Sequence, residues 1–272
     1  MYRTLKLDCK DRIATVVLNR PEARNAMSSK LMREMIACAA RVSAMRDVDV
    51  VIVRGRGVCF SAGADLKDVN RWGEGGRPLD EQREIASLGY RMARAWEEMP
   101  QITIAAVEGY AIGGGLAFAA ALDWRVIAEN AFVSLPEISL GIPLTWGTLP
   151  RLVNLVGPAR AKRLSILCER VTAAEALAMG LADYAAPPGK AFLTARTVAK
   201  QVLALPRNSV RMTKESVNAY ASIGAHAASH MAHDQRELAA GGAEAKAARA
   251  AFAAKRKKPA ASPERSPARR RR

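Results

Sequence analysis

A long apolar stretch interrupted by glycines occupies the middle of the chain. It runs from Ile102 to Leu122 and includes most of the segment GYAIGGGLAFAAALD, residues 109–123. It is long enough to span a bilayer, which takes about 20 apolar residues, but Glu108 and four glycines lie within it, and Asp123 and Arg125 follow it closely. A glycine costs a helix about 1 kcal/mol, whereas it readily adopts a positive φ and lets the backbone approach a ligand. We therefore predict a strand, a glycine turn and a short buried helix here, and no membrane span.

Short β-branched segments alternate with helical patterns along most of the chain. RIATVVLN, residues 12–19, and DVDVVIVRG, residues 47–55, are each bounded by turn residues, which is typical of buried strands. Between them, Ser28 or Ser29 can cap a helix whose apolar residues recur at three- and four-residue spacing. Further strands are expected over 102–109 and 123–129. This order predicts an α/β fold with a parallel sheet whose strands are buried on both faces.

The other segments are mostly helical. One helix is expected from about 79 to 99, and the chain becomes helical again after Pro150. Thr172 and Glu175 form a capping box for a helix that ends at Gly180, and residues 191–205 and 222–254 continue the helical part. We therefore divide the chain into an α/β core over residues 1–190, a helical region over 191–258 and a basic tail over 259–272.

Half of the net positive charge lies at the C-terminal end. The chain carries a net charge of +16, and its last eighteen residues carry nine Lys or Arg against one acid, Glu264, a net of +8. This segment is rich in Pro, Ala and Ser and cannot bury enough apolar surface to order itself, so the tail over residues 259–272 is predicted to be disordered. Binding of RNA or another polyanion is the alternative function that the tail offers. Because the tail has no aromatic residues to stack on bases, such contacts would be electrostatic, and we expect no nucleic-acid partner.

The cysteines and histidines point away from disulfides and metals. The four cysteines are far apart and form no C-x-x-C pair, and nothing before Arg12 resembles a signal peptide, so we expect a reducing, cytoplasmic location. His226, His230 and His233 could share one helical face and bind zinc. We expect instead a polar helix face, and neither a metal nor a cofactor.

Two glycine-bearing turns each follow a predicted strand. They are GRGVCFSAGADLK, residues 55–67, and EGYAIGGGLAF, residues 108–118. Ligands of open α/β sheets gather beyond the carboxyl ends of the strands, where backbone N–H groups point outward. Two such turns could direct two amides at one oxygen and form an oxyanion hole. Alternatively, the glycines only permit tight packing, and the spacing leaves both interpretations open.

Three motifs in register resemble those of one enzyme family. SAGADLK (61–67), AAVEGYAIGGG (105–115) and LPEISLGIP (135–143) are similar to motifs of the enoyl-CoA hydratase/isomerase family, the crotonase superfamily. NRPEARNAMS (19–28) and FAAKRKKP (252–259) resemble its terminal signatures, so the resemblance extends from about Arg12 to Pro259. It implies a spiral of β-β-α repeats with a helical trimerisation region, a trimer or dimer of trimers, and an acyl-CoA thioester as substrate.

The resemblance also assigns site residues. The amides of Ala64 and Gly114 would form the oxyanion hole for the thioester oxygen, and the loop 61–65 would line the adenine site. Phe252 and Lys255 often act across a subunit boundary in this family. The expected substrate contacts are Arg24, Ser61, Ala62, Gly63, Asp65, Leu66, Gly113, Ala117, Trp146, Phe252 and Lys255.

The acids of the resembling motifs favour one reaction. The family's hydratases carry two catalytic carboxylates, since one group activates water while another donates a proton. Glu137 matches the second, but Ala117 stands where the first would be. Monofunctional enoyl-CoA isomerases share this pattern, so we favour an isomerase in which Glu137 moves a proton between carbons. Hydration or another acyl-CoA lyase reaction remains the alternative. Trp146 would either shape the acyl pocket or belong to the core.

Three further acids lie near this predicted site. For Asp65 and Asp123 we expect structural roles, either loop fixing or pairing at a helix end. Glu108 receives no role and is expected to be an exposed residue at a strand end.

Overall fold

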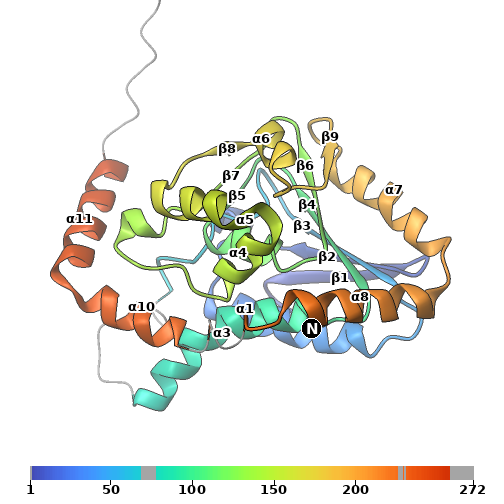
Figure 1. Ribbon diagram of the computed structural model, residues 1–272, viewed down its shortest axis with the longest axis horizontal. Helices are drawn as coiled ribbons and strands as arrows, with labels where there is room; N and C mark the ends of the chain where they lie inside the picture. The colour runs from blue at the N-terminus through green and yellow to red at the C-terminus, as the bar shows by residue number, and fades with distance from the viewer. Residues whose placement is uncertain (1, 69–77, 226–228, 230, 258–272) are drawn as a thin grey trace, which may run out of the picture.

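A twisted six-stranded sheet forms the centre of the computed structural model, which describes residues 2–68, 78–225, 229 and 231–257 (Figure 1). Its strand order is β1-β2-β3-β4-β6-β9, and a smaller sheet has the order β5-β7-β8. The strands are β1 (Leu5–Lys10), β2 (Ile13–Leu18), β3 (Val50–Gly55), β4 (Ile102–Val107), β5 (Tyr110–Ile112), β6 (Trp124–Ala128), β7 (Phe132–Ser134), β8 (Val171–Thr172) and β9 (Tyr184–Ala186).

The four predicted strands are confirmed as β2, β3, β4 and β6, and they pair in parallel. β1 was not predicted and pairs antiparallel with β2. The small sheet was not predicted either, because strands of two or three residues leave too short a pattern to detect. From β4 to β7 the chain alternates between the large sheet and the small one, with α4 between the β4–β5 and β6–β7 pairs; α5 then leads to β8 of the small sheet, and α6 leads to β9 of the large one. This is the β-β-α spiral that the resemblance implied.

The described helices cover the sheets. They are α1 (Ser29–Ser43), α3 (Leu79–Glu97), α4 (Gly114–Ala119), α5 (Thr148–Leu167), α6 (Ala173–Ala178), α7 (Ala191–Leu203), α8 (Arg207–Ala221), α10 (Ala232–Gly241) and α11 (Ala243–Lys257), with 3-10 turns η1 (Pro21–Ala23) and η2 (Ile138–Leu140). Successive residues of β3 point to opposite faces: Val51 and Val53 join the core with α1 and α3, while Val50 and Ile52 join the core with α7. Burial on both faces explains why the strands are continuously apolar.

The predicted boundary at residue 190 falls just before α7. The apolar side chains of α7 share a core with β3, β4 and β6, so this helix packs on the sheet of the same chain. The oligomerisation role of residues 191–258 stays a prediction. The tail over 259–272, His226, His230 and the side chain of His233 lie outside the described residues.

The apolar stretch from Ile102 to Leu122 is folded into β4, β5 and α4. The prediction of strand, glycine turn and short buried helix is therefore confirmed. In the part of the chain that the structure describes, none of the helices combines the length and the apolar character needed to cross a bilayer.

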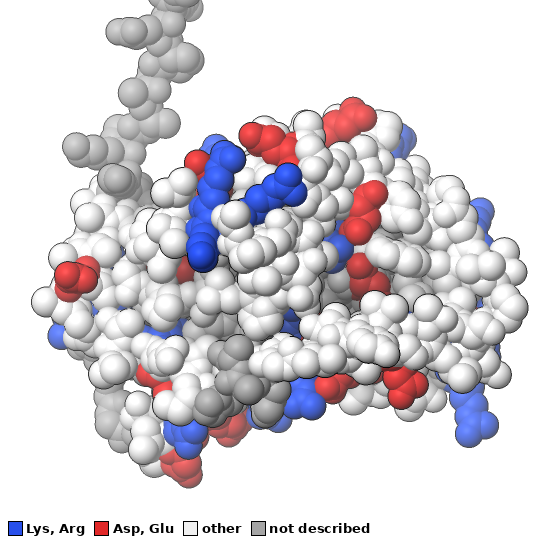
Figure 2. All heavy atoms as spheres, viewed as in Figure 1, with Lys and Arg blue, Asp and Glu red and all other residues white. Residues whose placement is uncertain are grey.

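Charged side chains are dispersed over the face seen in Figure 2. Uncharged surface separates most Lys and Arg residues there, apart from a small group near α5 and β8. Thus the half of the charge surplus that precedes Lys255 does not form one broad basic patch on this face.

The start of α1 distinguishes the two candidate caps. The hydroxyl of Ser28 accepts a hydrogen bond from the Leu31 amide at 3.2 Å, whereas the hydroxyl of Ser29 is buried with no partner among the described residues. We expect Ser28→Ala to lower the free energy of unfolding by about 1 kcal/mol because it removes the cap. Ser29→Ala, the matched control, should leave it unchanged or raise it, since a buried unpaired hydroxyl is lost. Urea denaturation of both variants measures this, and equal losses would contradict the assignment.

Candidate active site

The two glycine-bearing turns lie against each other. The Ile112 amide donates to the Ser61 carbonyl at 3.0 Å, and Ser61 and Ala111 form a parallel bridge. A methyl group added at Gly63 would lie 3.2 Å from the amide nitrogen of Gly114. The predicted convergence of the two turns is therefore present.

Two backbone amides are unpaired where the turns meet. A methyl group on Gly114 would lie 3.4 Å from the amide nitrogen of Ala64, so the two nitrogens are close together. Within the described part of the chain, neither N–H has a hydrogen-bond acceptor. The Gly114 N–H is free because this residue begins α4, where the first amides have no partner in the helix. A pair of free amides can bind an oxygen that develops negative charge.

The carboxylate of Glu137 lies beside Gly113, the residue before Gly114. Glu137 follows Pro136 at the start of η2, and its backbone carbonyl accepts from Leu140 and Ile142. A methyl group on Gly113 would lie 2.7 Å from Glu137 Oε1, so this side chain lies over the Gly113 backbone. Oε2 is buried and has no hydrogen-bond partner among the described residues.

Burial changes the acidity of this carboxyl group. It raises the pKa of Glu137 from 4.5 to about 7, since the charged form loses its hydration. A carboxyl group with a pKa near neutrality can both accept and release a proton at physiological pH.

No second acid comes from position 117. Ala117 is 3% exposed in α4, where its amide donates to the Gly113 carbonyl. The other acids predicted near the site have different partners. Asp65 pairs with Arg20 at 2.8 Å, and Asp123 pairs with the buried Lys214 at 2.7 Å.

These contacts give Asp65 and Asp123 structural partners, while the substrate contact predicted for Asp65 stays a prediction. Asp65 fixes its loop, since it also accepts from the Lys67 amide at 3.0 Å. Asp123 accepts from both the amide and the hydroxyl of Thr103. Glu108, which had no predicted role, accepts from the amides of Gly189 and Ala191 where α7 begins.

Residues of the predicted adenine loop have different exposures. The hydroxyl of Ser61 is buried and donates to the Asn25 carbonyl at 2.9 Å, so its side chain supports the loop from inside. The Ala62 amide donates to the carbonyl of Arg24 at 2.9 Å, which brings these two segments together. Arg24 is exposed and Leu66 is 43% exposed. Their contacts with a nucleotide stay predictions.

The C-terminal helix packs beside the Glu137 segment. Gly141, just after η2, has φ +70, and a methyl group there would lie 2.4 Å from the Cα of Ala245 in α11. Phe252 is half-buried on this helix, and the side chain of Lys255 lies outside the described residues. Thus α11 approaches the candidate site of its own chain, while a contribution across a subunit boundary stays a prediction.

Trp146 lies beside the free amides. It also contacts Gly89 on α3, a residue that was not predicted from the sequence. Trp146 is 4% exposed, and its indole ring lies between Gly89 and Gly114. The signal for Gly89 is a glycine inside an otherwise regular amphipathic helix, where it costs about 1 kcal/mol relative to alanine.

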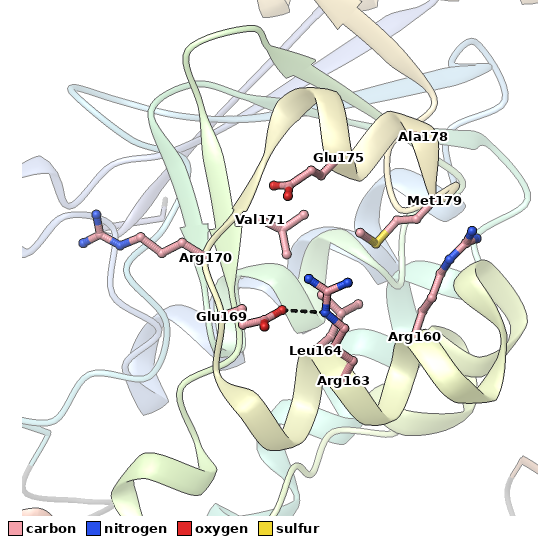
Figure 3. Close-up of a pocket in the computed structure, with 9 residues that line it drawn as sticks. All are labelled: Arg160, Arg163, Leu164, Glu169, Arg170, Val171, Glu175, Ala178 and Met179. Carbon is pink, nitrogen blue, oxygen red and sulfur yellow. Dashed lines mark hydrogen bonds and ion pairs between the residues drawn. The ribbon is translucent and has the colours of Figure 1, made fainter.

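A separate cavity of about 210 Å³ lies between α5, β8 and α6 (Figure 3). Two of its arginines already have partners: Arg163 pairs with Glu169 at 2.8 Å, and the guanidinium of Arg170 lies 4.5 Å from the centroid of the Phe132 ring. Arg170 also points away from the other lining residues. None of the predicted site residues lines this cavity.

Known proteins resemble this chain in sequence and in structure. Residues 8–261 match the family model described as enoyl-CoA hydratase/isomerase. The crotonyl-CoA hydratase of Syntrophomonas wolfei is 32% identical over 218 residues, 80% of this chain and 82% of the relative. The short-chain-enoyl-CoA hydratase of Clostridium acetobutylicum is 32% identical over 78% of this chain and 80% of its own length. An enoyl-CoA hydratase/isomerase structure from Xanthobacter autotrophicus has a TM-score of 0.84 and 28% identity, covering 94% of this chain and 98% of that one. The chain therefore belongs to the enoyl-CoA hydratase/isomerase family, the crotonase superfamily.

Proposed function

We propose that this acyl-CoA-processing enzyme is an enoyl-CoA isomerase in which Glu137 shifts the double bond of a 3-enoyl thioester. The observation that carries the proposal is a carboxylate whose Oε2 is buried and has no partner among the described residues, beside two free amides and with alanine at the position of the second acid. One proton-transferring group is sufficient to move a proton between carbons, whereas hydration needs two.

In the proposed reaction, Glu137 removes a proton from the α-carbon of the thioester. The electrons of that C–H bond delocalise onto the thioester oxygen, which accepts hydrogen bonds from the amides of Ala64 and Gly114. Glu137 then returns the proton to the γ-carbon, the double bond moves into conjugation with the carbonyl, and the carboxylate is regenerated. A pKa of about 7 suits a group that must accept this proton and release it again.

Hydration is the second candidate, and the names of the relatives favour it. Two of them are named as hydratases. In this chain a water molecule activated by Glu137 would need a separate proton donor, and Ala117 cannot supply it.

The test offers the purified protein 3-hexenoyl-CoA and 2-hexenoyl-CoA separately. We expect the first to be converted to the conjugated thioester, and the second to be hydrated at least about 100-fold more slowly, because a general acid or base contributes about that factor. Absorbance of the conjugated thioester follows both reactions. Hydration that outpaces isomerisation would refute the isomerase and establish the hydratase.

Exposed apolar side chains on α8 and just after it support the predicted homotrimer or dimer of trimers. Four of them are 58% to 80% exposed: Met212, Val217, Tyr220 and Ile223. Large apolar side chains exposed close together in the sequence are what a subunit contact would cover.

A further inference from the structure

The loop before α5 holds Trp146 in an unusual backbone conformation. Its φ is +63, which is uncommon for a residue other than glycine, and Gly147 follows with φ +67. The carbonyl of Trp146 accepts from Arg151 Nη1 at 2.7 Å. Arg151 is itself positioned by two hydrogen bonds to Glu97 on α3, at 2.8 and 2.7 Å. The position of the indole is therefore determined by contacts from α3 and α5.

The ring extends from α3 to α4. A methyl group added at Gly89 would lie 1.9 Å from Cε2 and 2.0 Å from Nε1 of Trp146. A methyl group at Gly114 would lie 2.5 Å from Cη2 and Cζ3, at the opposite edge of the ring. Both helices thus need glycine where the indole contacts them, and no other residue type fits at either position.

This ring borders the space where the reacting carbons must lie. Glu137 contacts Gly113 and Trp146 contacts Gly114, so the carboxylate and the indole lie over consecutive residues. A thioester oxygen on the amides of Gly114 and Ala64, with its α-carbon at Glu137, places the rest of the acyl group beside the ring. Additional methylene groups would occupy the volume that the indole now fills.

We propose that Trp146 is a specificity-determining residue that restricts the site to short acyl groups, of about four to six carbons. The inference rests on the proposed acyl-CoA site, and it holds for isomerisation and hydration alike. Removing the indole would leave free volume between Gly89 and Gly114, because neither glycine contributes a side chain there.

The experiment measures the binding of butyryl-CoA and decanoyl-CoA, two unreactive saturated thioesters, by titration calorimetry. The full chain is compared with Trp146→Ala, Trp146→Phe and the control Trp124→Phe. Trp124 lies on β6 with its ring 6.5 Å from that of Tyr184, outside the candidate site. Circular dichroism verifies that each variant is folded, and Trp146→Phe retains an aromatic ring should the alanine variant fail to fold.

In the unaltered protein, decanoyl-CoA should bind no more tightly than butyryl-CoA. In Trp146→Ala it should bind at least tenfold more tightly, since each buried methylene group improves affinity about fourfold, and Trp146→Phe should give a smaller gain. Trp124→Phe should keep the ratio of decanoyl-CoA affinity to butyryl-CoA affinity that the unaltered protein has. The inference is overturned if the unaltered protein already prefers decanoyl-CoA tenfold, or if the Trp146 variants have the same ratio of affinities as the unaltered protein.

The outcomes also separate this inference from the proposed function. If neither thioester binds to any variant, the acyl-CoA site and the role of Trp146 are both refuted. Chain-length selection that depends on Trp146, combined with hydration in place of isomerisation, would refute the isomerase alone.

Discussion

Glu137→Gln is expected to lower kcat for 3-enoyl-CoA isomerisation by about 10³-fold while KM changes little. The amide is nearly the same size as the carboxyl group but cannot accept the α-proton, and positioned proton transfer contributes about 10²- to 10⁴-fold. Steady-state assays measure the loss, and Glu129→Gln, an exposed glutamate after β6, is the matched control. A Glu137→Gln variant that keeps a tenth of the activity would refute the catalytic role.

The carboxyl group of Glu137 should also make kcat/KM depend on pH. Only the deprotonated form is a base, so kcat/KM should rise with pH through about 7, the pKa that burial gives Glu137. This step should be absent from the residual activity of Glu137→Gln. A profile that is flat between pH 6 and 8 in the unaltered protein would contradict the assignment.

As pH rises through about 7, the free energy of unfolding should fall while kcat/KM rises. Because the pKa of Glu137 is raised on folding from 4.5 to about 7, the folded state binds the proton more tightly than the unfolded state. The resulting stabilisation is present below pH 4.5 and is lost as pH rises to about 7. At pH 8, Glu137→Gln should therefore raise the free energy of unfolding, by up to about 3 kcal/mol. Urea denaturation at pH 8 would detect this gain, which a merely structural glutamate would not show.

Gly113→Ala is expected to lower kcat by at least about 100-fold. Gly113 has φ 53 and ψ −123, a conformation open essentially to glycine alone. The added methyl group would also lie 2.7 Å from Oε1 of Glu137 and displace the carboxylate from the space beside the free amides. A displacement of about 1 Å in a catalytic group can cost a factor of 10². The backbone strain should lower the free energy of unfolding by about 1–3 kcal/mol as well.

Gly189→Ala separates strain from the effect on the site. Gly189 also has a positive φ, +76, but a methyl group there meets no atom within 4 Å. This variant should lose stability and keep full activity per folded molecule. Equal activity of Gly113→Ala and Gly189→Ala, once corrected for the folded fraction, would show that the position of the Glu137 carboxylate does not depend on glycine at position 113.

Local patterns were sufficient for much of the fold. β2, β3, β4 and β6 are apolar runs bounded by turn residues, and the capping box of Thr172 and Glu175 is present with both of its hydrogen bonds. The glycines and Glu108 that interrupt the stretch 102–122 were sufficient to predict that it is not a single membrane-spanning helix. By contrast, β1 has an irregular pattern with mostly exposed residues. It becomes a strand because it pairs with β2, a contact that local sequence does not encode.

The candidate site divides in the same way. Motif resemblance identified Glu137, Ala64 and Gly114, and the family that it indicated is confirmed by the comparisons. The raised pKa of Glu137 could not be predicted, since it depends on how deeply the folded chain buries the carboxylate. Gly89 was missed because the indole that leaves no room for a side chain there belongs to Trp146, 57 residues further along the chain.

Residue types and their spacing alone predicted most of the strands and helices and the glycine turns that follow strands, while resemblance to family motifs pointed to Glu137 as the acid for proton transfer. These are properties of neighbouring residues, so a linear pattern can carry them. Only the tertiary structure shows that the unpaired amides of Ala64 and Gly114 lie close together, that the carboxylate of Glu137 is desolvated, and that Trp146 lies between α3 and α4. Each of these depends on atoms brought together from distant segments, because desolvation and close contact arise only when the surrounding chain is packed.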